Sequence, residues 1–245
     1  MKHTANKTLR TATIAAFMLL NVGLAAAQEA AIRKTLAARV PNLPPITSVA
    51  PAPIPGLYEV IIGSQIIYTD AKGEHLIEGN LVATQGMRNL TQERLDVVNA
   101  IPWKDLPLST ALVAKTGSGA RKVVVFADPN CGYCKKLQSE ALAKLKDATV
   151  YTIVIPILGP GSTSTSKRIL CSKDPAEAWS AWMLRGAAPT AAEGDCDPAK
   201  PIDEALTFAR ARHVVATPTL VFPNGKRVAS ALSAEQLEAL LASSQ

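Results

Sequence analysis

Residues 122–137 read KVVVFADPNCGYCKKL, and they place two cysteines between a buried strand and a helix. The run VVVF is continuously apolar, as in a strand that is covered on both faces. From Lys135 the apolar residues are spaced as in a helix, and residues 150–157 (VYTIVIPI) read as another buried strand. Strand, helix and strand of these lengths predict a βαβ unit. Cys131 and Cys134 are therefore expected at the N-terminus of its helix.

The segments after this unit complete an α/β domain. Residues 162–212 have helical spacing and contain two further cysteines. Residues 217–231 (TPTLVFPNGKRVASA) read as a strand, a Pro-Asn-Gly turn and a second strand. Residues 233–244 begin SAEQ, the pattern of a capping box, and read as a closing helix. We expect one domain over residues 117–245, with the helical segment as an insert.

The region before this domain predicts a small α+β module over residues 28–90. Residues 29–40 have helical spacing, and the prolines of residues 41–56 favour extended or turn geometry. Three strand candidates follow, LYEVIIG (57–63), QIIYT (65–69) and HLIEGNLVAT (75–84). Some sixty residues make a thin core, so an exposed strand edge is suited to pair with a second copy of the chain.

Residues 91–116 are expected to link the two domains. Thr91 is suited to cap a helix through TQERLDVVNA, which Pro102 ends. Pro102 and Pro107 break the segment Ile101–Lys115, so the linker helix is expected to be short.

The first 27 residues predict a secretory signal peptide. They start with three basic residues and no acid, continue with the apolar run TATIAAFMLLNVGLAAA, and end in three alanines. A membrane anchor is the alternative, but the run falls short of the roughly 20 residues that a span needs. No later stretch has membrane length, so we expect an exported, soluble chain without stable membrane insertion.

The mature chain has little charge to attract nucleic acid. The net charge of +6 falls to +3 when Lys2, Lys7 and Arg10 leave with the signal peptide, and the remaining basic residues are scattered. Export leads to an oxidising compartment, where disulfides persist. The four cysteines fall by position into two pairs, Cys131/Cys134 and Cys171/Cys196.

Three kinds of site suit the first pair: a metal site, a structural disulfide and a redox centre. Metal is disfavoured because no second Cys-x-x-Cys occurs and the mature chain has only two separated histidines, His75 and His213. A haem attachment would need histidine where Lys135 stands. A disulfide at a helix start leaves one sulfur exposed and labile. The helix N-terminus and Lys135 favour the thiolate of Cys131, with Cys134 behind it as the second thiol, which is what thiol–disulfide exchange needs.

The stretch FADPNCGYCKKL resembles the active-site segment of thioredoxin-fold enzymes, and CGYC resembles that of the DsbC/DsbG family of periplasmic protein disulfide isomerases. The likeness extends over nearly all of the mature chain. The N-terminal module resembles the dimerisation domain of that family, residues from Thr91 its linker, and ATPTLVFPNG its cis-proline loop.

This resemblance implies a role for eight residues. Cys131 is similar to the nucleophile and Cys134 to the resolving cysteine, while Gly132 and Tyr133 are similar to the dipeptide that helps to set redox poise. Thr217 and Pro218 resemble the Thr–cis-Pro pair that binds substrate backbone; a trans proline at a strand edge is the alternative. Cys171 and Cys196 are similar to the structural disulfide of the family.

The resemblance also implies an activity and partners. The expected enzyme reduces and isomerises incorrect disulfides in misfolded exported proteins, needs no cofactor or metal, and has chaperone activity. It is expected to be a periplasmic homodimer, joined through the N-terminal domains and kept reduced by a DsbD-type membrane reductase. The alternatives are a DsbG-like sulfenic-acid reductase, a DsbA-like oxidase and a dimeric holdase whose redox activity is secondary.

Other residues near the motif leave their roles open. Asp128 either caps the helix as a residue of the preceding loop or takes part in proton transfer at Cys134. Trp179 and Trp182, three apart on a predicted helix, are expected to belong to the core of the insert.

Overall fold

The structure is a computed structural model that describes residues 26–192, 194 and 196–244 of the 245. Contacts divide the chain into two units, Met1–Leu95 and Asp96–Gln245. The predicted signal peptide, residues 1–27, lies almost wholly outside the described residues. Among the residues that are described, no helix combines the length and the apolar character needed to cross a membrane.

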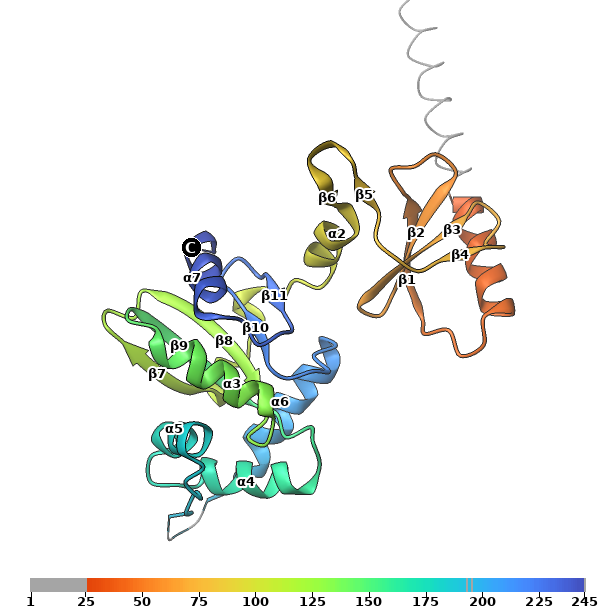
Figure 1. The fold of residues 1–245 in the computed structure, drawn as a ribbon. Coiled ribbons are helices and arrows are strands. Elements are labelled where there is room, and N and C mark those ends of the chain that lie inside the picture. Colours follow the sequence, from red (N-terminus) through yellow and green to blue (C-terminus); the bar gives the residue numbers. More distant parts are fainter. Residues whose placement is uncertain (1–25, 193, 195, 245) are drawn as a thin grey trace, which may run out of the picture. The chain divides into compact units, whose positions relative to one another are not determined.

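The first unit is an antiparallel sheet packed on one helix (Figure 1). Residues 26–39 form the helix. The strands lie in the order β1-β2-β3-β4, with bounds β1 Ile46–Pro51, β2 Leu57–Ile62, β3 Gln65–Asp70 and β4 Leu76–Ile77. Ile32 and Leu36 of the helix pack on Val60, Ile62 and Ile67. Val60 and Ile62 are two apart, so they share the face of the sheet that the helix covers.

Two details of this unit differ from the prediction. The proline-rich segment contains β1, because its prolines lie before the strand or at its end, where the missing N–H breaks no ladder bond. The single strand expected over residues 75–84 is interrupted. It forms β4 and then β5, which pairs with β6 in a separate two-stranded ladder; the further bounds are β5 Val82–Ala83, η1 Gln85–Met87, β6 Arg88–Asn89 and α2 Leu90–Val98.

The start of α2 is capped by a residue other than the one predicted. Asn89 Oδ1 accepts a hydrogen bond from the Gln92 amide at 2.9 Å. Thr91 lies inside the helix and is buried, and its hydroxyl bonds the Tyr68 hydroxyl at 2.6 Å. The Thr91 side chain, which the local pattern assigned to the helix cap, therefore makes a tertiary contact instead.

The second unit is built on a mixed five-stranded sheet in the order β11-β10-β8-β9-β7 (Figure 1). Strands β8 and β9 are parallel and joined through α3, as the predicted βαβ unit requires, and the other pairs are antiparallel. The bounds are β7 Leu112–Thr116, β8 Arg121–Ala127, α3 Gly132–Glu140, η4 Leu142–Lys144, β9 Ala148–Val154, β10 Thr219–Val221 and β11 Arg227–Val228. Edge strand β7 comes from the segment that we expected to be linker.

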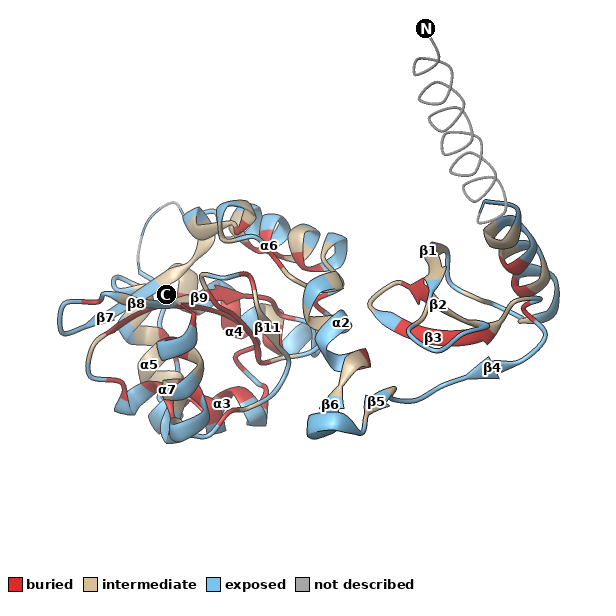
Figure 2. Ribbon diagram, turned by 90° about the horizontal axis from the view of Figure 1, so that it is seen from above, coloured by how far each residue is buried: buried red, intermediate tan, exposed pale blue. Residues whose placement is uncertain are grey.

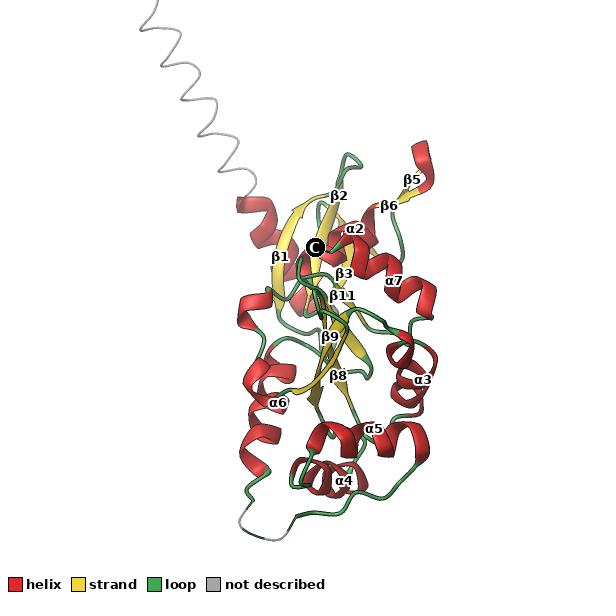
Figure 3. Cartoon of the chain, turned by 90° about the vertical axis from the view of Figure 1, so that its left-hand side faces the viewer, coloured by secondary structure: helices red, strands yellow, loops and turns green. Residues whose placement is uncertain are grey.

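Helices cover both faces of this sheet (Figure 3). Val123 and Val125 of β8 join the cluster that includes α3, α5 and α7, whereas Val124 and Phe126 join the cluster that includes α6. Strands β8 and β9 are largely buried (Figure 2). Their continuous apolar sequence follows from this coverage on both sides.

The helical insert lies between β9 and β10, and a further helix closes the chain. The bounds are α4 Pro160–Leu170, α5 Pro175–Arg185, α6 Ala199–Ala211 and α7 Ala234–Ser243. The capping box predicted for α7 is confirmed, because Ser233 accepts from the Gln236 amide and the Gln236 side chain accepts from the Ser233 amide. The predicted fold class, an antiparallel N-terminal sheet followed by an α/β domain with a helical insert, is confirmed.

Residues before β7 pack onto the second unit. Two short 3-10 turns, η2 Trp103–Asp105 and η3 Leu108–Thr110, follow Pro102. Ile101 is 1% exposed in the α6-side core, and its amide donates to the Gly225 carbonyl at 3.0 Å. This half of the expected linker is thus held to the α/β unit.

Candidate active site

Cys131 is the N-cap residue of α3. Its Sγ accepts a hydrogen bond from the Cys134 amide at 3.4 Å, and its thiol donates to the Thr217 carbonyl at 3.2 Å. An N-cap position is where a helix presents unpaired amides and the positive end of its dipole. The sulfur that the sequence assigned to nucleophilic attack therefore lies where a negative charge is stabilised.

Both sulfurs are covered more fully than the sequence suggested. Cys131 is 6% exposed and Cys134 is 3% exposed, although an exposed outer sulfur was expected. The segment that ends in Thr217 lies against Cys131 and accounts for the difference. Gly132 and Tyr133 between the two cysteines are exposed, Tyr133 to 70%, so solvent reaches the site over the dipeptide.

Cys134 occupies the inner side of the first turn of α3. Both cysteines are free thiols in this structure. Burial raises the pKa of the Cys134 thiol to about 12 because the thiolate would lose its hydration, and the neighbouring Cys131 thiol adds to the effect. Cys134 is therefore a neutral thiol at physiological pH, directly behind the N-cap sulfur.

The peptide bond between Thr217 and Pro218 is cis, and it directly precedes β10. The fold brings this pair to Cys131 across 86 positions of the chain. Proline has no amide hydrogen, so Pro218 offers no backbone donor beside the Cys131 sulfur.

Asp128 holds the loop that leads to Cys131. Its side chain is completely buried, and one carboxylate oxygen accepts from the Asn130 amide at 2.8 Å and from the Ser162 hydroxyl at 2.7 Å. The other oxygen accepts from the Leu158 amide at 3.0 Å. These donors belong to the loop, to Leu158 and to α4, and none belongs to α3, whose N-cap is Cys131. Asp128 therefore anchors the loop, and the predicted capping of the helix by this residue is wrong.

Trp182 is a site contact that sequence reasoning missed. Trp179 is 4% exposed and lies in the core, as both tryptophans were expected to do. Trp182 is half-buried, and its indole N–H donates to the Pro129 carbonyl at 2.7 Å. The Lys135 ammonium lies 4.7 Å from the centre of the Trp182 ring. Helical spacing predicted that both residues share α5 but could not predict this contact across 53 positions.

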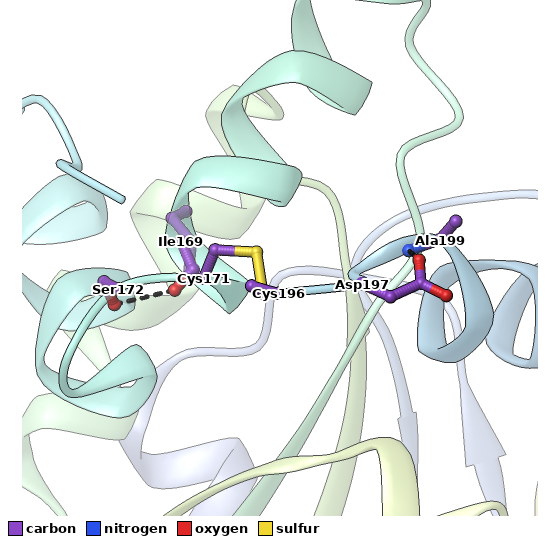
Figure 4. Close-up of a disulfide and its surroundings, with 6 residues drawn as sticks. All are labelled: Ile169, Cys171, Ser172, Cys196, Asp197 and Ala199. Atoms are coloured by element: carbon purple, nitrogen blue, oxygen red, sulfur yellow. Dashed lines mark hydrogen bonds between the residues drawn. A yellow bond between two sulfur atoms is a disulfide. The ribbon is translucent and has the colours of Figure 1, made fainter. Parts of the chain in front are cut away.

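The other two cysteines form a disulfide within the insert (Figure 4). Cys171 is the C-cap of α4, and Cys196 precedes α6, with 5.8 Å between the two Cα atoms. The disulfide therefore joins the two ends of the segment that contains α5. In the part of the chain that is described, no group of three or more His, Cys, Asp or Glu side chains is arranged to hold a metal ion.

Comparison with known proteins matches both units. Residues 23–92 match the family described as the disulfide bond isomerase protein N-terminal domain, and residues 108–245 match the thioredoxin-like domain. A probable thiol:disulfide interchange protein DsbC of Bordetella pertussis is 41% identical over 80% of this chain and 68% of its own length. The thiol:disulfide interchange protein DsbC of Escherichia coli is 30% identical over 84% of both chains. The crystal structure of a disulfide interchange protein from Neisseria gonorrhoeae is similar with a TM-score of 0.52 and 36% identity, over 57% of this chain and 99% of its own.

Proposed function

The chain belongs to the DsbC family of thiol:disulfide interchange proteins, and we propose that Cys131 and Cys134 perform the interchange. The observation that carries this proposal is the asymmetry of the pair. Cys131 caps α3 and accepts from a main-chain amide, whereas burial keeps the thiol of Cys134 neutral. Thiol–disulfide exchange by a cysteine pair needs one sulfur that attacks the substrate and a second that resolves the mixed disulfide.

In the proposed reaction the Cys131 thiolate attacks one sulfur of a substrate disulfide. The substrate S–S bond breaks, a Cys131–substrate disulfide forms, and the second substrate sulfur leaves as a thiolate. If that thiolate attacks another bond and a substrate sulfur finally displaces Cys131, the substrate is isomerised without net redox change. If Cys134 attacks Cys131 instead, the substrate gains two electrons and the pair leaves as a disulfide. Only thiols take part, so no cofactor is needed.

Residues around the pair support the remaining assignments. Thr217 and Pro218 border Cys131 and are proposed to bind the substrate backbone, with Gly132 and Tyr133 setting the redox poise. The Cys171–Cys196 disulfide is proposed to be structural, since it joins the end of α4 to the segment before α6 within the insert.

The proposed setting is the periplasm, after cleavage of residues 1–27. Residues 28–90 are proposed to join two copies, residues 91–116 to link them to the catalytic domain 117–245, and a DsbD-type membrane reductase to return electrons. The match of residues 23–92 to an isomerase N-terminal domain supports the dimer. Misfolded exported proteins with incorrect disulfides are the proposed substrates.

The test is refolding of a scrambled protein that contains several disulfides. The reduced mature chain should restore native pairing, and Cys131→Ser should abolish this activity. Cys134→Ser should retain part of it and accumulate mixed disulfides. Recovery by Cys131→Ser at the rate of the unsubstituted chain would contradict the assignment. Preference for a sulfenylated single-cysteine protein over the scrambled one would favour the DsbG-like alternative.

Chaperone activity is a second candidate, supported by exposed apolar side chains near the pair. Tyr133, Leu158 and Val215 are 70%, 58% and 78% exposed, and each belongs to a segment that adjoins the site. Large exposed apolar groups are suited to bind unfolded chains. Cys131→Ala separates the two functions: suppression of aggregation should survive while exchange is lost.

A further inference from the structure

One side chain of the helical insert contacts the chain on both sides of Cys131. The Trp182 indole N–H donates to the carbonyl of Pro129, which lies two residues before the cysteine. The face of the same ring holds the ammonium of Lys135, which lies four residues after it. Trp182 comes from α5, a helix that packs against α3.

We propose that Trp182 is a positioning residue for the Cys131–Cys134 pair: it fixes the loop before Cys131 and holds the Lys135 charge beside α3. This inference rests on the proposed function, in which Cys131 is the exchanging sulfur. Trp182 itself touches neither sulfur, so it acts through Pro129 and Lys135.

The loop before Cys131 depends on the insert for its side-chain anchors. Its Asp128 carboxylate accepts from Ser162 on the first turn of α4, and its Pro129 carbonyl accepts from Trp182 on the last turn of α5. Helices α4 and α5 of the insert thus each supply one donor to adjacent residues of the loop. A loop held at two successive residues has little freedom to move the N-cap that follows it.

Trp179 shows that this is a specific contact rather than a general property of α5. The Trp179 side chain is buried on the same helix, and its indole nitrogen has no hydrogen-bond partner within the described part of the chain. Trp182 is less buried, yet both its N–H and its ring face are used. The two tryptophans therefore provide a matched pair for substitution.

Through its contact with Lys135, Trp182 affects the redox equilibrium of the Cys131–Cys134 pair. Lys135 is one helical turn beyond Cys131, and its amide donates to the Cys131 carbonyl at 3.1 Å, so both residues lie on the same side of α3. A cation held nearby favours the thiolate and hence the reduced pair. Without the ring, the ammonium moves into water, where its effect is screened.

The experiment measures the equilibrium of the pair with glutathione, using the mature chain and thiol-specific mass labelling to count reduced molecules. Trp182→Leu and Lys135→Gln should each shift the equilibrium constant about two- to fivefold toward the Cys131–Cys134 disulfide, the size of one partly exposed cation–π contact. That is about 10–20 mV at 29.6 mV per tenfold change. The double variant should behave like Lys135→Gln alone, because the ring acts on the equilibrium through that charge.

Hydrogen exchange tests the loop contact separately. Trp182→Phe keeps a ring face and removes only the N–H donor, so the amides of residues 129–131 should exchange faster. Trp179→Phe, the matched control, should change neither this exchange nor the glutathione equilibrium. If Trp182→Leu does not fold, Lys135→Gln still tests the charge, because it alters only a half-buried side chain outside the core.

Two results would overturn the inference. One is a glutathione equilibrium unchanged within the measurement in both Trp182→Leu and Lys135→Gln. The other is an equal shift in Trp179→Phe, which would assign the effect to general packing of α5. An unsubstituted chain whose pair exchanges no electrons with glutathione would instead refute the proposed function itself, so the two failures are distinguishable.

Discussion

The raised pKa of Cys134 predicts that the reduced protein loses stability at alkaline pH. Burial moves the pKa of this thiol from its ordinary value of 9.0 to about 12. Below pH 9 the thiol is protonated in both the folded and the unfolded state, so it contributes no pH dependence. Above pH 9 the unfolded state releases the proton while the folded state retains it. Because the folded state then binds more protons, the free energy of unfolding falls as pH rises toward 12.

The size of the effect follows from the difference between the two pKa values. Each pH unit between 9 and 12 removes about 1.4 kcal/mol, so the complete loss is about 4 kcal/mol at pH 12. At pH 10, where most proteins still fold, the loss relative to pH 7 is about 1.4 kcal/mol. This is a large part of a stability of about 5–15 kcal/mol.

The assay compares the reduced chain with Cys134→Ser, which has no titrating group at this position. Urea denaturation of both proteins at pH 7 and pH 10, followed by tryptophan fluorescence, gives the free energy of unfolding of the second unit, which contains all three tryptophans. Groups that titrate away from this position are common to both proteins and cancel in the difference. Between pH 7 and pH 10, the free energy of unfolding of the cysteine form should fall by about 1.4 kcal/mol more than that of Cys134→Ser. A difference that stays constant between the two pH values would show that Cys134 ionises as readily in the fold as outside it.

Three further predictions concern the surroundings of the pair. Asp128→Asn should cost about 2 kcal/mol of unfolding free energy, since an amide N–H would face the Leu158 amide; urea denaturation measures this, and a cost near zero would contradict the anchoring role. Replacing both Cys171 and Cys196 by alanine should cost about 3.5 kcal/mol by the chain-entropy estimate for their 25-residue separation, and an unchanged thermal midpoint would refute it. Ile101→Ala should destabilise the second unit by about 3 kcal/mol, because the residue is 1% exposed; a surface-like effect below 0.5 kcal/mol would place it in a free linker instead.

Features with a local cause could be predicted from the sequence. The apolar run of β8 and the capping box of α7 each depend on a few neighbouring residues, and both are found where expected. β1 was missed because prolines suggest irregular structure, although at the margins of an edge strand they cost no ladder bond. β7 was missed because apolar and polar residues alternate only weakly around Lys115. These residues form a strand through their pairing with β9.

The candidate site likewise combines a feature with a local cause and contacts that depend on the tertiary fold. The spacing of Cys131 and Cys134 before a helix indicated the position of the pair, which lies at the start of α3 as expected. The contacts of Trp182 with Pro129 and of Ser162 with Asp128 connect residues 53 and 34 positions apart, and no local pattern encodes them. The covering of Cys131 by the Thr217 segment is equally a product of the tertiary fold.

The burial of Cys134 also bears on the balance between isomerisation and reduction. In the proposed Cys131–substrate disulfide, the freed substrate thiol and Cys134 would compete to attack next, and only thiolates attack. Burial is the largest cause of the raised pKa of Cys134 and persists in this intermediate, so a smaller fraction of Cys134 than of an exposed substrate thiol is ionised at pH 7. The greater nucleophilicity of the more basic thiolate recovers part of this difference in ionised fraction.

Since this recovery is incomplete, the substrate thiol keeps an advantage in reactive thiolate. The closeness of Cys134 to Cys131 offsets part of it, because an intramolecular partner has a high effective concentration. A buried second sulfur thus lengthens the time in which the substrate can rearrange its own bonds before Cys134 releases it reduced. We infer that the desolvation of this one thiol on the inner side of α3 favours isomerisation over reduction.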